Sequence, residues 1–126
     1  MAKTHSKTQK KIDNNVRLTL TAVCDQLLEE LAGFQWLTHQ ANYTNFPASL
    51  LITCVFDTPE SHQQVDTVAV HKKIQLALLK IGVKLKAPNQ QVIFDSEEAC
   101  TREHEGHWAN RLDQRKGRCI AKNRPG

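Results

Sequence analysis

The fold is decided by one stretch of the chain, Leu50-Leu51-Ile52-Thr53-Cys54-Val55-Phe56. This stretch is apolar on both faces of an extended backbone, and its β-branched and aromatic residues favour a strand. A strand that is apolar on both faces has to be covered on both sides. We therefore predict a central strand whose sheet carries packed structure on each face.

Three helices are predicted around this strand. Between residues 12 and 31 the apolar residues recur at spacings of three and four, which indicates one buried helix face, and Gly33 ends that helix. A second helix is expected over residues 59–81, with polar first turns. A third is expected from about residue 96 to 114, and Gly106 can interrupt it.

Three further strands complete the predicted pattern. Residues 34–43 follow the first helix, residues 83–86 alternate between apolar residues and lysine, and residues 91–94 are mostly apolar. The predicted order is helix, strand, strand, helix, strand, strand, helix.

An internal duplication relates the two halves of this pattern. Residues 55–60 and 93–98 each end an apolar strand in Phe-Asp-[Ser/Thr]-x-Glu. Moving the last strand to the front gives the element order of a ferredoxin-like fold. We therefore predict an α+β class, with a two-layer αββαββα arrangement. Its sheet is expected to be a permuted ferredoxin-like split β-α-β sheet of order 3-4-2-1, followed by a C-terminal helix.

Positive charge is concentrated at the two ends of the chain. The 126 residues carry a formal net charge of +4, yet residues 1–11 alone carry +4 and residues 111–126 carry +5, which leaves −5 for residues 12–110. We expect a single domain over residues 12–114, between a disordered basic N-terminal tail (1–11) and a disordered basic C-terminal tail (115–126).

The composition excludes several classes of protein. With 40% hydrophobic and 24% charged residues, the chain is typical of a globular protein. It has no apolar run near the ~18 residues of a membrane span and no apolar stretch of a secretory signal near residue 1. We expect a cytoplasmic protein with reduced cysteines and no membrane partner. Since no phosphate loop or nucleophile motif occurs, no cofactor and no catalytic residue are predicted, and the sequence leans against an enzyme.

The repeated D-x-x-E motif, at residues 57–60 and 95–98, has two interpretations. Carboxylates at strand ends can hold Mg²⁺ or act as acids and bases. Residues of the same type also cap helices, with Asp57 or Thr58 and Asp95 or Ser96 accepting from exposed amides. We favour capping, because the predicted central strands run antiparallel and would place the two motifs at opposite ends of the sheet.

A candidate metal site is formed by Cys100, His104 and His107, which helical spacing brings near one face. The spacing is not a usual one for zinc. Cys100, His104, Trp108 and Leu112 equally make a stripe that packs on the sheet, and this is the interpretation we favour. Under both interpretations Cys100 and His104 are partly buried.

Aromatic and histidine side chains offer a weaker signal. Trp36, Tyr43 and Phe46 could form an exposed platform for stacking bases, although a small satellite core under a loop is the more common arrangement and the one we favour. The histidines expected to be solvated at the surface are His39, His62 and His71.

Several segments together resemble a known family. They are residues 34–39, 54–58 and 94–100, followed by Arg102-Glu103-His104. Over roughly residues 12–112 the chain resembles small bacterial proteins that are often labelled Fis-family transcriptional regulators. Fis-type DNA binding rests on a C-terminal helix-turn-helix. Because one short helix is expected in the C-terminal region, no recognition helix is predicted and the resemblance implies no binding residues.

The predicted function is a non-enzymatic binding module whose basic tails contact nucleic acid or a ribonucleoprotein, without reading its sequence. One alternative is a homodimeric protein-interaction module that uses the open sheet face. Another is a metal-binding protein or enzyme built on the Cys100, His104 and His107 site. The residues expected to contact phosphate are Lys3, Lys7, Lys10, Lys11, Arg111, Arg115, Lys116, Arg118, Lys122 and Arg124.

Overall fold

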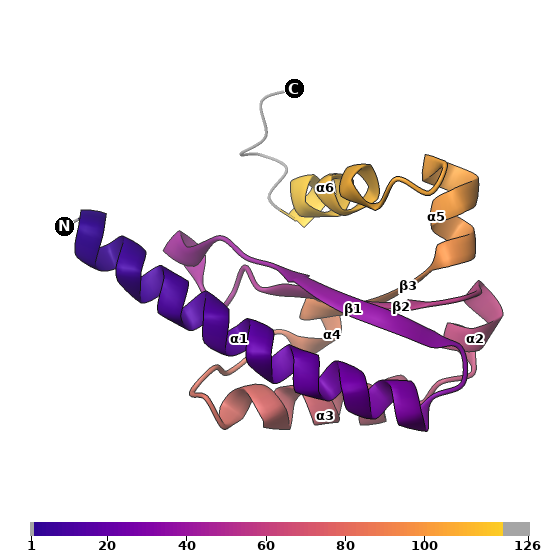
Figure 1. Ribbon diagram of the computed structural model, residues 1–126, viewed down its shortest axis with the longest axis horizontal. Coiled ribbons are helices and arrows are strands. Elements are labelled where there is room, and N and C mark those ends of the chain that lie inside the picture. The colour runs from indigo at the N-terminus through magenta and orange to yellow at the C-terminus, as the bar shows by residue number, and fades with distance from the viewer. Residues whose placement is uncertain (1, 120–126) are drawn as a thin grey trace.

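The chain folds into an α+β structure in which helices lie on both faces of a small sheet (Figure 1). The structure is a computed structural model, and it describes the backbone of residues 2–119 and the side chains of residues 9–113. The elements in chain order are α1 (Ala2–Glu30), β1 (Phe34–Gln40), the 3-10 turn η1 (Tyr43–Asn45), β2 (Leu51–Phe56), α2 (Pro59–Gln63), α3 (Thr67–Leu79), α4 (Pro88–Gln91), β3 (Val92–Ser96), α5 (Glu97–His104) and α6 (Trp108–Cys119).

The sheet formed by the described residues has three strands in the order β1-β2-β3. β1 pairs with β2 in antiparallel register, with Leu37 opposite Cys54, and β2 pairs with β3 in parallel register, with Cys54 opposite Phe94. Every residue of β2 is buried. The predicted central strand is therefore confirmed.

The predicted four-stranded sheet of order 3-4-2-1 differs from the observed one. Residues 83–86 are not a strand, although their side chains do alternate between buried Val83 and Leu85 and exposed Lys84 and Lys86. Val83 and Leu85 belong to the main core. The alternation therefore reflects a connection that lies over the core, and the permuted ferredoxin-like arrangement is not confirmed.

The helices also differ in extent from the prediction. The predicted helix over residues 59–81 is divided into α2 and α3, and Asp66 caps the second of these by accepting from the Ala69 amide at 3.2 Å. α1 begins at Ala2, so residues 2–11 are helical where a disordered tail is expected. No glycine or proline between residues 2 and 31 interrupts this helix. α6 reaches Cys119, and residues 120–126 of the expected C-terminal tail lie outside the described residues.

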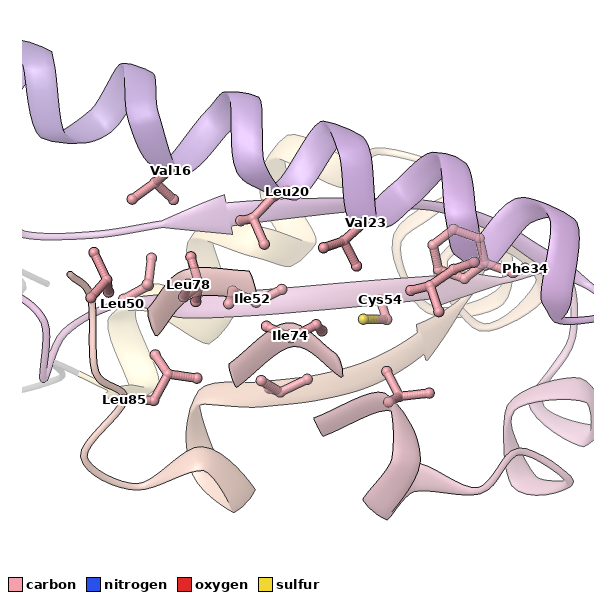
Figure 2. Packing of buried hydrophobic residues seen from close by; sticks show 14 of the residues in the cluster. Val16, Leu20, Val23, Phe34, Leu50, Ile52, Cys54, Ile74, Leu78 and Leu85 are labelled. Carbon is pink, nitrogen blue, oxygen red and sulfur yellow. The ribbon is translucent and has the colours of Figure 1, made fainter. Parts of the chain in front are cut away.

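The main core lies between one face of the sheet and the helices α1 and α3. Side chains from α1 point toward β2, and Ile74 and Leu78 of α3 pack into the same core beside them (Figure 2). The labelled members of this core are Val16, Leu20, Val23, Phe34, Leu50, Ile52, Cys54, Ile74, Leu78 and Leu85.

The opposite face of the sheet carries the intervening strand residues, because side chains alternate along a strand. α5 and α6 lie on this side (Figure 1). Here β1 presents Trp36 and Gln40, β2 presents Thr53, and β3 presents Asp95. This second face is therefore more polar than the first. None of the described helices combines the length and the apolar character that crossing a membrane requires.

Candidate nucleic-acid interface

A buried ion pair joins α6 to β3. The Arg111 guanidinium donates to both carboxylate oxygens of Asp95, with Nε 2.6 Å from Oδ2 and Nη2 2.8 Å from Oδ1. Its Nη1 donates to Glu103 Oε1 at 2.8 Å. The side chains of Arg111 and Asp95 are only 8% and 3% exposed. The hydrogen bond to Asp95, opposed by burial, raises the pKa of Arg111 above its usual value, so this guanidinium stays charged.

The geometry of Arg111 corrects its predicted role as a phosphate contact. Its guanidinium is buried and three of its nitrogens already donate to carboxylates, so it is not available at the surface. The sequence held a signal for this, because Arg111 is next to Leu112 and one turn after Trp108 in the predicted sheet-facing stripe. Arg111 is therefore a residue that fastens α6 to the sheet.

A second carboxylate fixes two tryptophans on the same face. Glu97 Oε2 accepts from Trp36 Nε1 at 2.8 Å, and its Oε1 accepts from Trp108 Nε1 at 2.7 Å. The two indole rings meet edge to face, with centroids 4.9 Å apart. Glu97, at the start of α5, thus connects β1 with α6, a role that the sequence analysis missed.

The aromatic residues do not form one platform. Trp36 lies with Trp108 on the α6 side of the sheet, whereas Tyr43 stacks on Phe46, with ring centroids 5.1 Å apart, beside α1. Phe46 packs against the main core. Tyr43 and Phe46 therefore pack together at the margin of the main core, and Trp36 does not join them.

Asp13 of α1 holds the end of β1 through two hydrogen bonds. The hydroxyl of Tyr43 donates to Asp13 Oδ1, and His39 Nε2 lies 2.9 Å from the same oxygen. These hydrogen bonds, of which the one from Tyr43 has the larger effect, lower the pKa of Asp13. Burial of the Tyr43 hydroxyl and its hydrogen bond to the Asp13 carboxylate raise the pKa of Tyr43. The His39 side chain is only 15% exposed, so the prediction that this histidine is solvated was wrong.

The D-x-x-E motifs are helix caps. Thr58 Oγ1 accepts from the Ser61 amide at 3.2 Å, and Ser96 Oγ accepts from the Ala99 amide at 3.1 Å. The capping interpretation is confirmed, with Thr58 and Ser96 as the N-caps.

The predicted placement of the two motifs at opposite ends of the sheet was wrong. β2 and β3 are parallel, so both motifs lie at the same end, where the Glu98 amide donates to the Asp57 carbonyl at 3.0 Å. A parallel pair needs a crossover of a dozen or more residues, and the connection through α2, α3 and α4 provides one. Asp95 nevertheless points into the Arg111 pair while Asp57 is exposed, so the carboxylates do not form one site.

The candidate metal ligands are not brought together. Cys100 is buried and His104 is half-buried, so their predicted burial is confirmed. The Nδ1 atom of His104 lies 3.1 Å from Arg111 Nη1. His107 lies beyond the helix break and is exposed. Among the side chains that the structure describes, no three His, Cys, Asp or Glu residues are grouped as ligands.

The C-terminal region contains two helices where one was expected. Glu105 and Gly106, with φ of 54° and 80°, separate α5 from α6. This break lets α6 turn back, so that the carbonyl of Leu112 accepts from Gln40 Nε2 at 3.0 Å. A second helix is therefore present after a short turn, but its Trp108 and Arg111 are bound to partners on the sheet side.

The remaining predicted phosphate contacts divide between α1 and α6. Lys10 and Lys11 are exposed on α1. For five other positions the structure describes the helix backbone but not the side chain: Lys3 and Lys7 in α1, and Arg115, Lys116 and Arg118 in α6. The last two positions, Lys122 and Arg124, lie outside the described residues.

Both basic helix ends flank the same edge of the sheet. His39 and Gln40 are neighbours in β1 and point to opposite faces; His39 contacts Asp13 of α1, and Gln40 contacts Leu112 of α6. From these contacts α1 leads back to its lysine-rich first turns, which extend beyond the end of β1 in Figure 1, and α6 leads on to its basic last turns on the other face of the sheet. Comparisons with family models, curated proteins and solved structures found no match.

Proposed function

We propose that the protein is a non-enzymatic module that binds nucleic acid through the basic ends of α1 and α6. One observation supports this proposal: the contacts of His39 with Asp13 and of Gln40 with Leu112 tie α1 and α6 to the last two residues of β1, an edge strand, on opposite faces of the sheet. Two cationic segments held on either side of an edge can contact a phosphate backbone from both sides, and each neutralised phosphate releases counterions.

The spacing of the α1 lysines supports the proposal. At 100° per residue, helix positions 3, 7, 10 and 11 lie within about 100° of one another. Val16 and Leu20 of the same helix are buried against the sheet, about half a turn away, while Lys10 and Lys11 are exposed. Within its first turns, residues 2–11, this face of α1 therefore has four lysine positions and no acid, whereas Asp25 and Glu29 lie on the same face near the other end of the helix.

The chemistry favours binding that does not depend on base sequence. Lysine acts as a mobile point charge, and contacts to phosphate position a protein on nucleic acid without reading bases. An arginine has the planar fork that reads bases, and the guanidinium of Arg111 is occupied by Asp95. We therefore expect similar affinities for duplexes of different sequence.

The test is a fluorescence anisotropy titration of the full chain with a labelled duplex of mixed sequence, from about 50 to 200 mM salt. If all seven basic residues at positions 3–11 and 115–118 contact phosphate, log K falls with log salt with a slope of roughly −6. Reversing two of these charges in Lys10→Glu/Lys11→Glu should weaken binding at least tenfold at about 50 mM salt and flatten the slope by about 2. Arg115→Glu/Lys116→Glu should do the same from the other side of the edge.

A matched control separates this site from general charge. Lys86→Glu/Arg102→Glu makes the same change of net charge at two exposed positions on other elements. We expect it to bind within about twofold of the wild type, with circular dichroism confirming that every variant is folded. Binding that is insensitive to salt, or an equal loss in the control, would overturn the proposal.

The resemblance to proteins labelled Fis-family regulators adds a second part to the proposal, which is a regulatory role on DNA in the bacterial cytoplasm. Replacing the duplex DNA by duplex RNA and by single strands of the same length tests this part. DNA should compete at least as well as RNA. Exclusive binding of RNA would instead favour a ribonucleoprotein as the partner.

A further inference from the structure

α1 and α3 expose apolar side chains on the side that faces away from the sheet. α3 buries one face of its helix in the main core through Val70, Ile74 and Leu78. Its other side should then be polar, as in a surface helix, but exposed apolar side chains stand there among the lysines. The large apolar residues exposed on this outer layer are Leu18 (55%) of α1 and Val68 (72%), Leu76 (54%) and Leu79 (48%) of α3.

A groove runs between the two helices on this outer layer. The groove is open to solvent and measures about 680 Å³. Apolar side chains line it together with polar ones, and the polar members are Thr19, Gln26, Lys72, Lys73 and Lys80. Small residues on both helices leave the groove open, and the exposed leucines stand beside it. Exposed leucines beside a groove between two helices are typical of a surface that binds a partner.

The two walls of the groove carry opposite charge. From residue 18 to 31, α1 has three acids and no base, and from residue 67 to 80 the α3 segment has three lysines and no acid. One ion pair already joins the walls, with Lys73 Nζ 3.3 Å from Glu30 Oε1. The other members of these two sets, which are exposed, are Asp25, Glu29, Lys72 and Lys80.

The two helices run in opposite directions along the groove. Lys73, at the middle of α3, contacts Glu30 at the end of α1, whereas residues 81–83, after α3, line a pocket with Ile12 and Asn15. The acidic end of α1 therefore lies level with the middle of α3, where Lys72 and Lys73 are.

We propose that a second copy of this chain covers the groove and forms a twofold dimer. A twofold axis parallel to the groove places α1 of each copy over α3 of the other. The exposed acids Asp25 and Glu29 then face the lysine-bearing α3 of the partner subunit, and Leu18 and Leu76 are covered. A twofold axis across the groove would instead stack α1 on α1 and α3 on α3, so that no acid of α1 faces a lysine of α3; charge therefore favours the first arrangement.

The test is the molar mass of the full chain, measured by light scattering and sedimentation velocity over a range of concentrations. The expected mass is twice the 14.3 kDa of one chain. Leu76→Asp should raise the dissociation constant of the dimer at least about tenfold and give a monomer at micromolar concentration. Leu28→Asp is the matched control, because Leu28 is 48% exposed on α1 without lining the groove, and it should stay dimeric.

A charge exchange tests the orientation. Asp25→Lys/Glu29→Lys should weaken the dimer, and adding Lys72→Glu/Lys80→Glu to the same chain should restore it, because the walls are then exchanged in sign. All of these positions are exposed, and circular dichroism melting confirms that each variant is folded. A wild-type monomer at all concentrations, a dimeric Leu76→Asp, or a charge exchange that restores nothing would overturn the proposal. The nucleic-acid proposal is tested separately, because salt-dependent binding of a duplex can be measured whether the protein is a monomer or a dimer.

Discussion

Arg111 attaches α6 to the sheet through its side chain. It is the buried partner of Asp95, and its removal leaves a carboxylate in the interior without its cation. Breaking one side of such a pair usually costs about 3–5 kcal/mol. We predict a loss of this size in the free energy of unfolding for Arg111→Met, measured by urea denaturation.

Two further variants make this prediction specific. Arg102→Met removes an arginine that is 59% exposed and should change stability by no more than about 0.5 kcal/mol. Asp95→Leu/Arg111→Met removes both charges and should recover most of the loss, because an apolar replacement of a buried pair is often neutral. If Arg111→Met and Arg102→Met are equally stable, the ion pair does not hold α6.

Asp13 gives stability a dependence on pH. Its hydrogen bonds from Tyr43 and His39 lower its pKa in the folded state. A lowered pKa contributes stability above the unfolded value of about 3.9, and this contribution is lost as the pH falls through the folded pKa. We predict that Asp13→Asn loses about 0.5 kcal/mol near pH 6, a modest figure because Asp13 is 47% exposed.

The sign of this effect is checked by urea unfolding from about pH 6 to 3. The difference between the wild type and Asp13→Asn should shrink as the pH falls, and Tyr43→Phe should move the acid loss of stability to higher pH, because it removes the main cause of the lowered pKa. A difference that stays constant down to pH 3 would show that the Asp13 charge contributes nothing.

The sequence predicted some of these residue roles and not others. Thr58 and Ser96 were recognised as candidate caps because a cap and its amide are three residues apart. The partners of Glu97 and Asp13 were missed, since Trp36 is 61 residues from Glu97 and His39 is 26 residues from Asp13. Local spacing carries no information about such pairs until strand directions are known.

At the scale of elements, two glycines that end helices make a matched comparison. Gly33 and Gly82 have nearly the same φ, +84° and +81°. A Cβ at Gly33 would lie 2.5 Å from Ser61 Oγ and 2.8 Å from Asp57 Oδ1, whereas a Cβ at Gly82 would have nothing within 4 Å. We predict that Gly82→Ala costs about 1 kcal/mol, from the backbone alone.

Gly33→Ala should cost more, roughly 2–3 kcal/mol, because the added methyl also collides with the start of α2. Thermal unfolding followed by circular dichroism measures both variants. Equal losses would mean that Ser61 and Asp57 move aside freely. A larger loss for Gly82→Ala would contradict the packing at the α1–β1 junction.

The elements themselves were predicted unevenly, for a physical reason. β2 was found because burial on both faces leaves a continuous apolar run. The direction of β3 was not, because the same Phe-Asp-[Ser/Thr] ending suits a parallel or an antiparallel neighbour. Residues 83–86 alternate as a strand does, yet Val83 and Leu85 enter the core without a neighbouring strand. The alternation of apolar residues therefore predicts which side chains are buried. Which strands pair, and in which direction, depends on how the chain crosses over between them, and alternation does not predict this.

At the scale of the whole molecule, the two faces of the sheet are held by different forces. One face packs an apolar core against α1 and α3, and the other is joined to α6 by the ion pair of Arg111, the tryptophans bound to Glu97 and the bond of Gln40 to Leu112. α5 and the strands bury Val55 and Cys100 on this second face, but α6 itself is attached mainly through these polar contacts, and an element attached in this way opens at a lower free energy than an apolar core. We therefore expect α6 to open locally while the sheet and α3 stay folded.

Native-state hydrogen exchange tests this expectation through a pair of variants. Ile74→Val should lower the protection of amides in β2 and α3 by about 1 kcal/mol and leave α6 unchanged, because the core is still intact when α6 is open. Arg111→Met should lower the protection of α6 as well, because the open state lacks its ion pair. If Ile74→Val lowers protection in α6 as much as in β2, the two layers unfold together, and the basic end of α6 cannot then move independently of α1 when it meets a phosphate backbone.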